Sequence, residues 1–130
     1  MIEGLKDGTI DAICSDHCPE DVEHKVLTFD HANFGIIGAQ TVLPLALELQ
    51  KELGLHTIID ALSHNPRKLL GIECPTIEEG AEANLCCFST SDEWTFNEES
   101  IVSKSKNTPF LNRTFKTKVW GTVKGSLSTF

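Results

Sequence analysis

The stretch from Ile10 to Pro19 constrains the fold more than any other part of the chain. Its first half is apolar apart from Asp11, and its second half is polar and ionisable, in the order Ser15-Asp16-His17-Cys18-Pro19. A near-continuous apolar run is typical of a strand buried on both faces of a parallel α/β sheet. Side chains that follow such a strand line a crevice shared by neighbouring loops. The stretch therefore predicts a buried strand over residues 10–14.

Asp16 lies at the end of this predicted strand, where a metal ligand or a general base would lie. A plainer interpretation stays open, in which Ser15 and Asp16 only cap the following turn through side-chain hydrogen bonds to the backbone.

A long polar segment, residues 20–34, follows Pro19. It is rich in ionisable side chains and shows neither a helical nor a strand period. Loops of this length inside compact domains are more often functional than idle. The segment closes on Phe34-Gly35-Ile36-Ile37-Gly38, where the glycines either let the backbone approach a neighbouring group closely or form an ordinary turn. We therefore expect a functional loop here.

The remainder of the chain predicts helices first and strands afterwards. Apolar spacing predicts helices over residues 39–53, from 57 to 62, and from 65 to 70. After Cys74-Pro75 the pattern changes to short strands, expected at residues 85–88, 94–96, 118–120 and 126–130. We expect two parts, residues 1–72 and 73–130. A parallel strand at 10–14 needs a crossover that the residues before it are too few to supply, so we expect the chain to be the C-terminal end of a longer protein.

Charge and cysteine content exclude several classes of function. The chain has 11 basic and 19 acidic residues and a formal net charge of −8, which argues against nucleic acids and anionic membranes as partners. Five cysteines are an odd number without a disulfide framework, which indicates reduced thiols in a cytosolic protein. Cys14, His17 and Cys18 lack a second ligand pair at zinc-finger spacing, which disfavours a zinc site made by them alone.

Several short motifs follow one another along essentially the whole chain. They are Asp7-Gly8-Thr9-Ile10-Asp11, Ser15-Asp16-His17-Cys18-Pro19, Ala32-Asn33-Phe34-Gly35-Ile36-Ile37-Gly38, Thr41-Val42-Leu43-Pro44-Leu45, Asn65-Pro66-Arg67, Gly80-Ala81-Glu82-Ala83-Asn84-Leu85 and Ser103-Lys104-Ser105-Lys106-Asn107-Thr108-Pro109-Phe110. Each motif is weak alone, and as a set they are specific. The set resembles the class I dihydroorotases of the amidohydrolase superfamily.

The resemblance implies a fold and an activity. The fold is a (β/α)₈ barrel beside a small β-sandwich, of which this chain resembles the last barrel strand with its helices and the C-terminal sandwich strands. Members of the family hydrolyse the cyclic amide of dihydroorotate reversibly in pyrimidine biosynthesis, with zinc as cofactor. In them the aspartate at the position of Asp16 binds zinc and transfers the proton, a role that suits a carboxylate beside an activated water. The backbone at Phe34 and Gly35 resembles the segment that contacts the substrate ring.

Two features depart from the family pattern. The histidine that binds the substrate carboxylate in the family is replaced by Glu20, whose charge would repel a carboxylate. The family's other zinc ligands correspond to positions before Met1, and Asp16 alone cannot retain a catalytic zinc ion. We therefore expect the chain alone to be inactive.

Two further functions and one association stay open at this stage. Glu20 raises the alternative of a non-catalytic homologue that serves as a scaffold for aspartate transcarbamoylase, as some relatives of the family do. A hydantoinase-like cyclic-amide hydrolase is the other alternative. An unpaired strand at 10–14 and the unburied apolar stripe of the helix after Ala39 predict self-association of the isolated chain, or disorder in residues 15–35.

Overall fold

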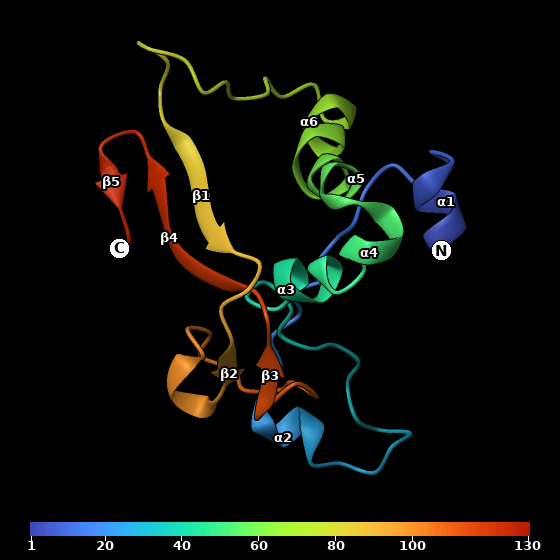
Figure 1. The fold of residues 1–130 in the computed structure, drawn as a ribbon. Coiled ribbons are helices and arrows are strands. Elements are labelled where there is room, and N and C mark those ends of the chain that lie inside the picture. The colour runs from blue at the N-terminus through green and yellow to red at the C-terminus, as the bar shows by residue number, and fades with distance from the viewer.

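The computed structural model describes all residues from Met1 to Phe130. Helices occupy the first half of the chain and strands the second half (Figure 1). Helix α1 (Ile2–Lys6) lies beside the central helices, and the one-turn helix α2 (Val22–Lys25) lies in the long polar segment. None of the helices has the length and apolar character that a membrane crossing requires.

The helix expected over residues 39–53 is present as two shorter helices. Helix α3 (Val42–Leu47) follows Thr41 at its N-cap, and Pro44 lies in its first turn, where the missing amide hydrogen is harmless. Helix α4 (Gln50–Leu53) ends at Gly54, which has a φ of 77° that favours glycine.

The two helices expected after residue 57 form one continuous helical run. It consists of α5 (Leu55–Ile59), the π-helical turn η1 (Asp60–His64) and α6 (Asn65–Leu69). The helix expected to begin at residue 65 is therefore a continuation of the helix that begins at Leu55. The π-helical turn comes shortly before Pro66, whose ring and missing amide hydrogen disfavour regular α-helical bonding to the preceding turn. Gly71, with a φ of 66°, follows the end of the run.

A three-stranded antiparallel sheet has the order β1-β4-β5, with β1 (Asn84–Ser89), β4 (Lys118–Lys124) and β5 (Leu127–Ser128). Asn84 faces Lys124 and Ser89 faces Lys118, with a register shift between Cys87 and Phe88. All three strands overlap the expected ones, and β4 is longer than predicted. All five cysteines are free.

A two-stranded antiparallel sheet pairs β2 (Trp94–Phe96) with β3 (Arg113–Phe115). Strand β2 has the predicted bounds, whereas β3 was not predicted, because its sequence Arg113-Thr114-Phe115 contains a single apolar side chain. A 3-10 turn, η2 (Glu98–Ser100), follows β2. The Trp94 ring contacts Phe96 edge-on at a centroid distance of 5.7 Å, so aromatic packing stabilises this sheet.

Residues 10–14, expected to be a strand, pair with no strand of this chain. A strand is held by hydrogen bonds to a neighbouring strand, and no other parallel strand is present. The segment is held instead by a hydrogen bond from the Ile13 amide to the Ala61 carbonyl (2.9 Å) and by packing of the Ile13 side chain on the helices.

The buried apolar residues form two small clusters. One lies among the helices and contains Ala46, Leu47, Leu53 and Ile58. The other joins Ile37 to Phe96 and Phe115, so the segment after the polar loop packs on the two-stranded sheet. The division of the chain into residues 1–72 and 73–130 stays a prediction. The second cluster contains residues from both of these parts.

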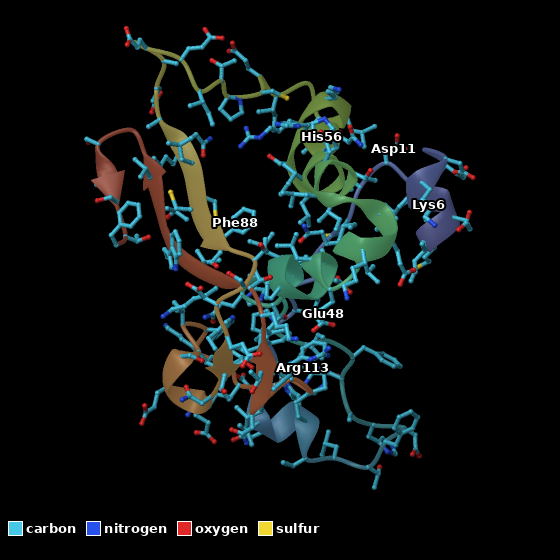
Figure 2. All side chains as sticks on the ribbon, viewed as in Figure 1. Lys6, Asp11, Glu48, His56, Phe88 and Arg113 are labelled. Carbon is cyan, nitrogen blue, oxygen red and sulfur yellow. The ribbon has the colours of Figure 1, made fainter.

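An ion pair also joins the helices to the two-stranded sheet. The Nη2 atom of Arg113 donates to both carboxylate oxygens of Glu48 (2.8 and 2.7 Å), and the guanidinium lies 5.2 Å from the Phe115 ring centroid. Figure 2 shows Glu48 and Arg113 close to each other, where the helices meet β3. This contact helps to fix the position of the sheet relative to the helices.

Candidate active-site loop

The two ends of the polar segment lie side by side. His17 and Ile36 form an isolated parallel bridge, in which the Cys18 amide donates to the Ile36 carbonyl (2.8 Å). We call residues 19–34 the active-site loop and this paired base its neck. The neck brings residues 17 and 18 beside residue 36, so the loop begins and ends at one place. That Asp16 and Phe34 share one site stays a prediction.

The His17 side chain stabilises the neck. Its Nδ1 atom accepts hydrogen bonds from the Gly38 amide (3.1 Å) and the Ala39 amide (3.2 Å). An Nδ1 atom that accepts is unprotonated, so in the neutral ring the proton lies on Nε2. His17 therefore has a structural role at the neck, which the sequence pattern did not distinguish from a ligand role.

The glycines of the neck allow a close backbone approach, as expected. A Cβ atom at Gly38 would lie 2.2 Å from the Ser15 carbonyl oxygen. Gly35 has a φ of 122°, and a Cβ atom there would lie 2.9 Å from the Cys18 carbonyl oxygen. Any larger residue at Gly38 would push the two ends of the loop apart.

Asp16 lies at the tip of the 10–16 segment and is exposed. Its φ of 44° is in the left-handed region, which non-glycine residues adopt rarely and aspartate more readily than most. Its carboxylate makes no hydrogen bond within the chain. The Asp16 side chain therefore does not cap the following turn, and its role in a functional site stays a prediction.

Glu20 points back into its own loop. Its Oε2 atom accepts from the Asn33 side-chain amide (3.1 Å) and lies 3.4 Å from His24 Nδ1. The Glu20 side chain is only 18% exposed. In this geometry the Glu20 carboxylate bonds to residues of its own loop.

Phe34 and Gly35 differ sharply in their surroundings. Phe34 is 91% exposed, so its ring packs on nothing within the chain. The Gly35 carbonyl accepts from Lys25 Nζ (3.1 Å) and from the Asn107 side chain (2.9 Å). The Asn107 contact was missed by sequence reasoning, although the polar motif that contains it was noted.

The residues of this chain do not assemble a metal site by themselves. No group of three or more His, Cys, Asp and Glu side chains is placed so that it could hold an ion. Asp16 fits a zinc site as a single exposed oxygen ligand, whereas zinc sites use three or four protein ligands.

Comparison with curated proteins places the chain among known sequences. No family model matches it. The dihydroorotase of Ehrlichia canis is 39% identical over 132 residues, and those of Chlorobaculum tepidum and Aquifex aeolicus are 41% and 40% identical. The chain belongs to the dihydroorotase family. It corresponds to the C-terminal portion of these proteins and spans about 30% of their length, while between 95% and 100% of the chain is matched.

Solved structures agree with this assignment. An L-hydantoinase (dihydropyrimidinase) from Arthrobacter aurescens matches 98% of the chain with a TM-score of 0.85 and 25% identity. The inactive dihydroorotase-like domain of a CAD-like multifunctional protein from Chaetomium thermophilum matches with a TM-score of 0.68 and 17% identity, which shows the fold alone. The chain covers 30% and 34% of these two structures. The expected fold class, the last part of an amidohydrolase barrel with sheets from its C-terminal part, is therefore confirmed.

Proposed function

We propose that this chain is the C-terminal part of a zinc-dependent hydrolase of cyclic amides, which interconverts dihydroorotate and carbamoyl aspartate in pyrimidine biosynthesis in the cytoplasm. The identity of about 40% to curated dihydroorotases supports this substrate class. The single structural observation that carries the proposal is the exposed, unpartnered Asp16 at the neck of a long loop. The chain alone is expected to be inactive.

In this proposal Asp16 is both a metal ligand and the group that transfers the proton. A bound zinc ion would supply a water that is a nucleophile near neutral pH. Asp16 is exposed and has a left-handed backbone conformation, and its carboxylate would accept a proton and return it to the leaving nitrogen. The remaining zinc ligands would come from parts of the longer protein outside these 130 residues.

Phe34, Gly35 and Glu20 are proposed to form the substrate side. The exposed Phe34 ring would cover one face of the substrate ring, and the backbone at Gly35 would contact its polar edge. Because Glu20 is held by Asn33 and His24, it would shape the loop and leave the substrate carboxylate to another group.

The test uses the longer protein that contains this chain, with and without Asp16→Asn. We expect the unsubstituted protein to contain zinc and to hydrolyse dihydroorotate. Asp16→Asn should lower kcat/KM by about 100-fold or more and reduce the bound zinc, because amides are weaker ligands and poor bases. Asp30→Asn, at an exposed carboxylate in the same loop, is the matched control and should change neither value. A metal-free and inactive unsubstituted protein would sink the enzyme proposal.

The L-hydantoinase similarity makes a hydantoinase-type substrate the second candidate. Assaying the same protein with dihydroorotate, hydantoin and dihydrouracil separates the two. Higher kcat/KM on hydantoin or dihydrouracil would favour the hydantoinase-like reaction over the dihydroorotase reaction.

Glu20 supports a third candidate, a non-catalytic scaffold that binds aspartate transcarbamoylase. Glu20→His tests it, because it restores the residue that the family uses for the substrate carboxylate. Recovery of dihydroorotate binding by Glu20→His would favour an enzyme of altered specificity. No binding by either form, together with tight association with aspartate transcarbamoylase, would favour the scaffold.

A further inference from the structure

Asn107 joins the two ends of the active-site loop from outside. It lies in the segment after η2, more than 70 residues along the chain from the neck. We propose that Asn107 is a positioning residue that holds the loop, and with it Asp16 and Phe34, in one geometry. As a role in substrate binding, the proposal rests on the proposed function.

The Asn107 side chain contacts three residues at the two ends of the loop. Its Nδ2 atom donates to the Gly35 carbonyl (2.9 Å) and the Cys18 carbonyl (3.3 Å), and its Oδ1 atom accepts from the Glu20 amide (3.3 Å). Its own carbonyl accepts from the Ile37 amide (3.0 Å). Four hydrogen bonds from one residue thus reach both sides of the neck.

This set of contacts requires a side-chain amide. Two donors and one acceptor in one plane are available from asparagine, whereas aspartate at neutral pH has no donor. A carboxylate of the same size would point a negative oxygen at two carbonyl oxygens. The contacts therefore depend on the chemistry of the amide and not only on its volume.

Two neighbouring groups complete the contact. The Ser105 hydroxyl donates to the Glu20 carbonyl (2.6 Å). Lys25 Nζ, from the loop itself, donates to the Asn33 carbonyl (2.6 Å) and the Gly35 carbonyl (3.1 Å). The loop is thus anchored at its first residues by Ser105 and Asn107, and at its last residues by Asn107 and Lys25.

The neck has other hydrogen bonds that do not involve Asn107. The Cys18 amide bonds to Ile36, and His17 accepts from Gly38 and Ala39. Loss of the Asn107 side chain should therefore loosen the loop without unfolding the chain. The contact affects the order of the loop, and through it the placement of Asp16, more than global stability.

The first test is amide hydrogen exchange in the longer protein that contains this chain, comparing Asn107→Ala and Asn107→Asp with the parent sequence. We expect Asn107→Ala to raise the exchange rate of the Glu20 amide about tenfold, because this amide loses its acceptor, the Asn107 Oδ1 atom. The Ile37 amide, whose acceptor is the main-chain carbonyl of Asn107, should change less. The amides of Ile58 and Phe115, in the two cores, should not change. Asn84→Ala, an exposed asparagine of β1, is the matched control and should leave the loop unchanged.

Asn107→Asp separates hydrogen bonding from packing. A packing role predicts exchange like that of the parent sequence, because aspartate has nearly the same volume. Our proposal predicts faster loop exchange than in Asn107→Ala, because the carboxylate repels two carbonyl oxygens. If Asn107→Ala perturbs the cores, Ser105→Ala provides the milder variant. It removes a hydroxyl that contacts the Glu20 carbonyl and the Asn107 Oδ1 atom, and it should raise exchange most at the first loop residues. Unchanged loop exchange in Asn107→Ala, or parent-like exchange in Asn107→Asp, would overturn the proposal.

The second test uses the longer protein and a cyclic-amide substrate. Asn107→Ala should raise KM about tenfold and lower kcat less, because a mobile loop must be ordered on binding. If the unsubstituted longer protein hydrolyses no cyclic amide, the proposed function fails, and the exchange data alone decide the role of Asn107 in holding the loop. An active protein whose KM and kcat are both unchanged in Asn107→Ala would contradict the role in substrate binding.

Discussion

At the scale of single residues, the site depends on close backbone contacts at the neck. Gly38 and Gly35 bring the chain into contact with Ser15 and Cys18, and His17 bonds to two amides on the opposite side. Asp16 itself contacts little, so its position is determined by these neighbours. Substitutions at the neck should therefore change the position of the Asp16 carboxylate, although they do not replace Asp16 itself.

Gly38→Ala tests this view of the neck. Because the new Cβ atom would lie 2.2 Å from a backbone oxygen, we expect a loss of about 1–3 kcal/mol in the free energy of unfolding, measured by denaturant titration. Gly4→Ala is the control, since its Cβ atom would meet only the flexible end of Ile10 and alanine favours helix α1. Equal effects of the two substitutions would contradict a rigid contact at Gly38.

At the scale of elements, the helical run from α5 to α6 places the carboxylate of Asp60 between two histidines. The Asp60 Oδ1 atom lies 2.7 Å from His64 Nδ1, and His56 is 4.0 Å away on the other side. The hydrogen bond with His64, with smaller contributions from nearby positive charges, lowers the pKa of Asp60 below its usual value of 3.8. The π-helical turn thus contains a charge interaction that stabilises the folded chain.

The pH dependence of this interaction can be measured with Asp60→Asn. A lowered folded-state pKa stabilises the folded chain fully above the unfolded value of 3.8, and the contribution is lost as the pH falls through the folded pKa. We expect Asp60→Asn to be less stable than the parent chain at neutral pH, with a difference that shrinks below pH 3.8. Asp30→Asn, at an exposed carboxylate, should show no such trend. A difference that grows on acidification would contradict the assignment.

At the scale of the whole molecule, the chain leaves a large apolar face uncovered. Only eight hydrophobic residues form the buried core. A hollow of about 660 Å³ is lined by apolar side chains of α1, the 10–14 segment and α3. The 10–14 segment, which has no strand partner, forms part of this face. The structural relatives are about three times longer than the chain, and the remainder of a barrel would cover such a face.

We predict that the isolated chain associates with itself through this face. Ile10→Glu should reduce the mean mass measured by sedimentation, because a charge in the hollow opposes apolar contact. Ile77→Glu, which replaces an 87% exposed residue elsewhere, should not change the mass. A monomeric mass for the parent chain at high concentration would contradict the prediction.

The sequence alone determined the local features of this protein. Apolar spacing and turn residues act over a few positions, so the presence of the helices and of most strands followed from them. The motifs around Asp16 and Asn107 likewise indicated the dihydroorotase family, because they depend on residue type and order. The polar segment was recognisable as a loop for the same reason.

Only the tertiary structure decided how distant parts meet. The break between α3 and α4, the π-helical turn, and the missing strand at 10–14 depend on which neighbours are present to accept hydrogen bonds. The contacts of Asn107 with Cys18, Glu20 and Gly35 join residues more than 70 positions apart, which no local period can reveal. The stretch from Ile10 to Pro19 supplies Asp16, and the segments that fold against it determine where that carboxylate lies.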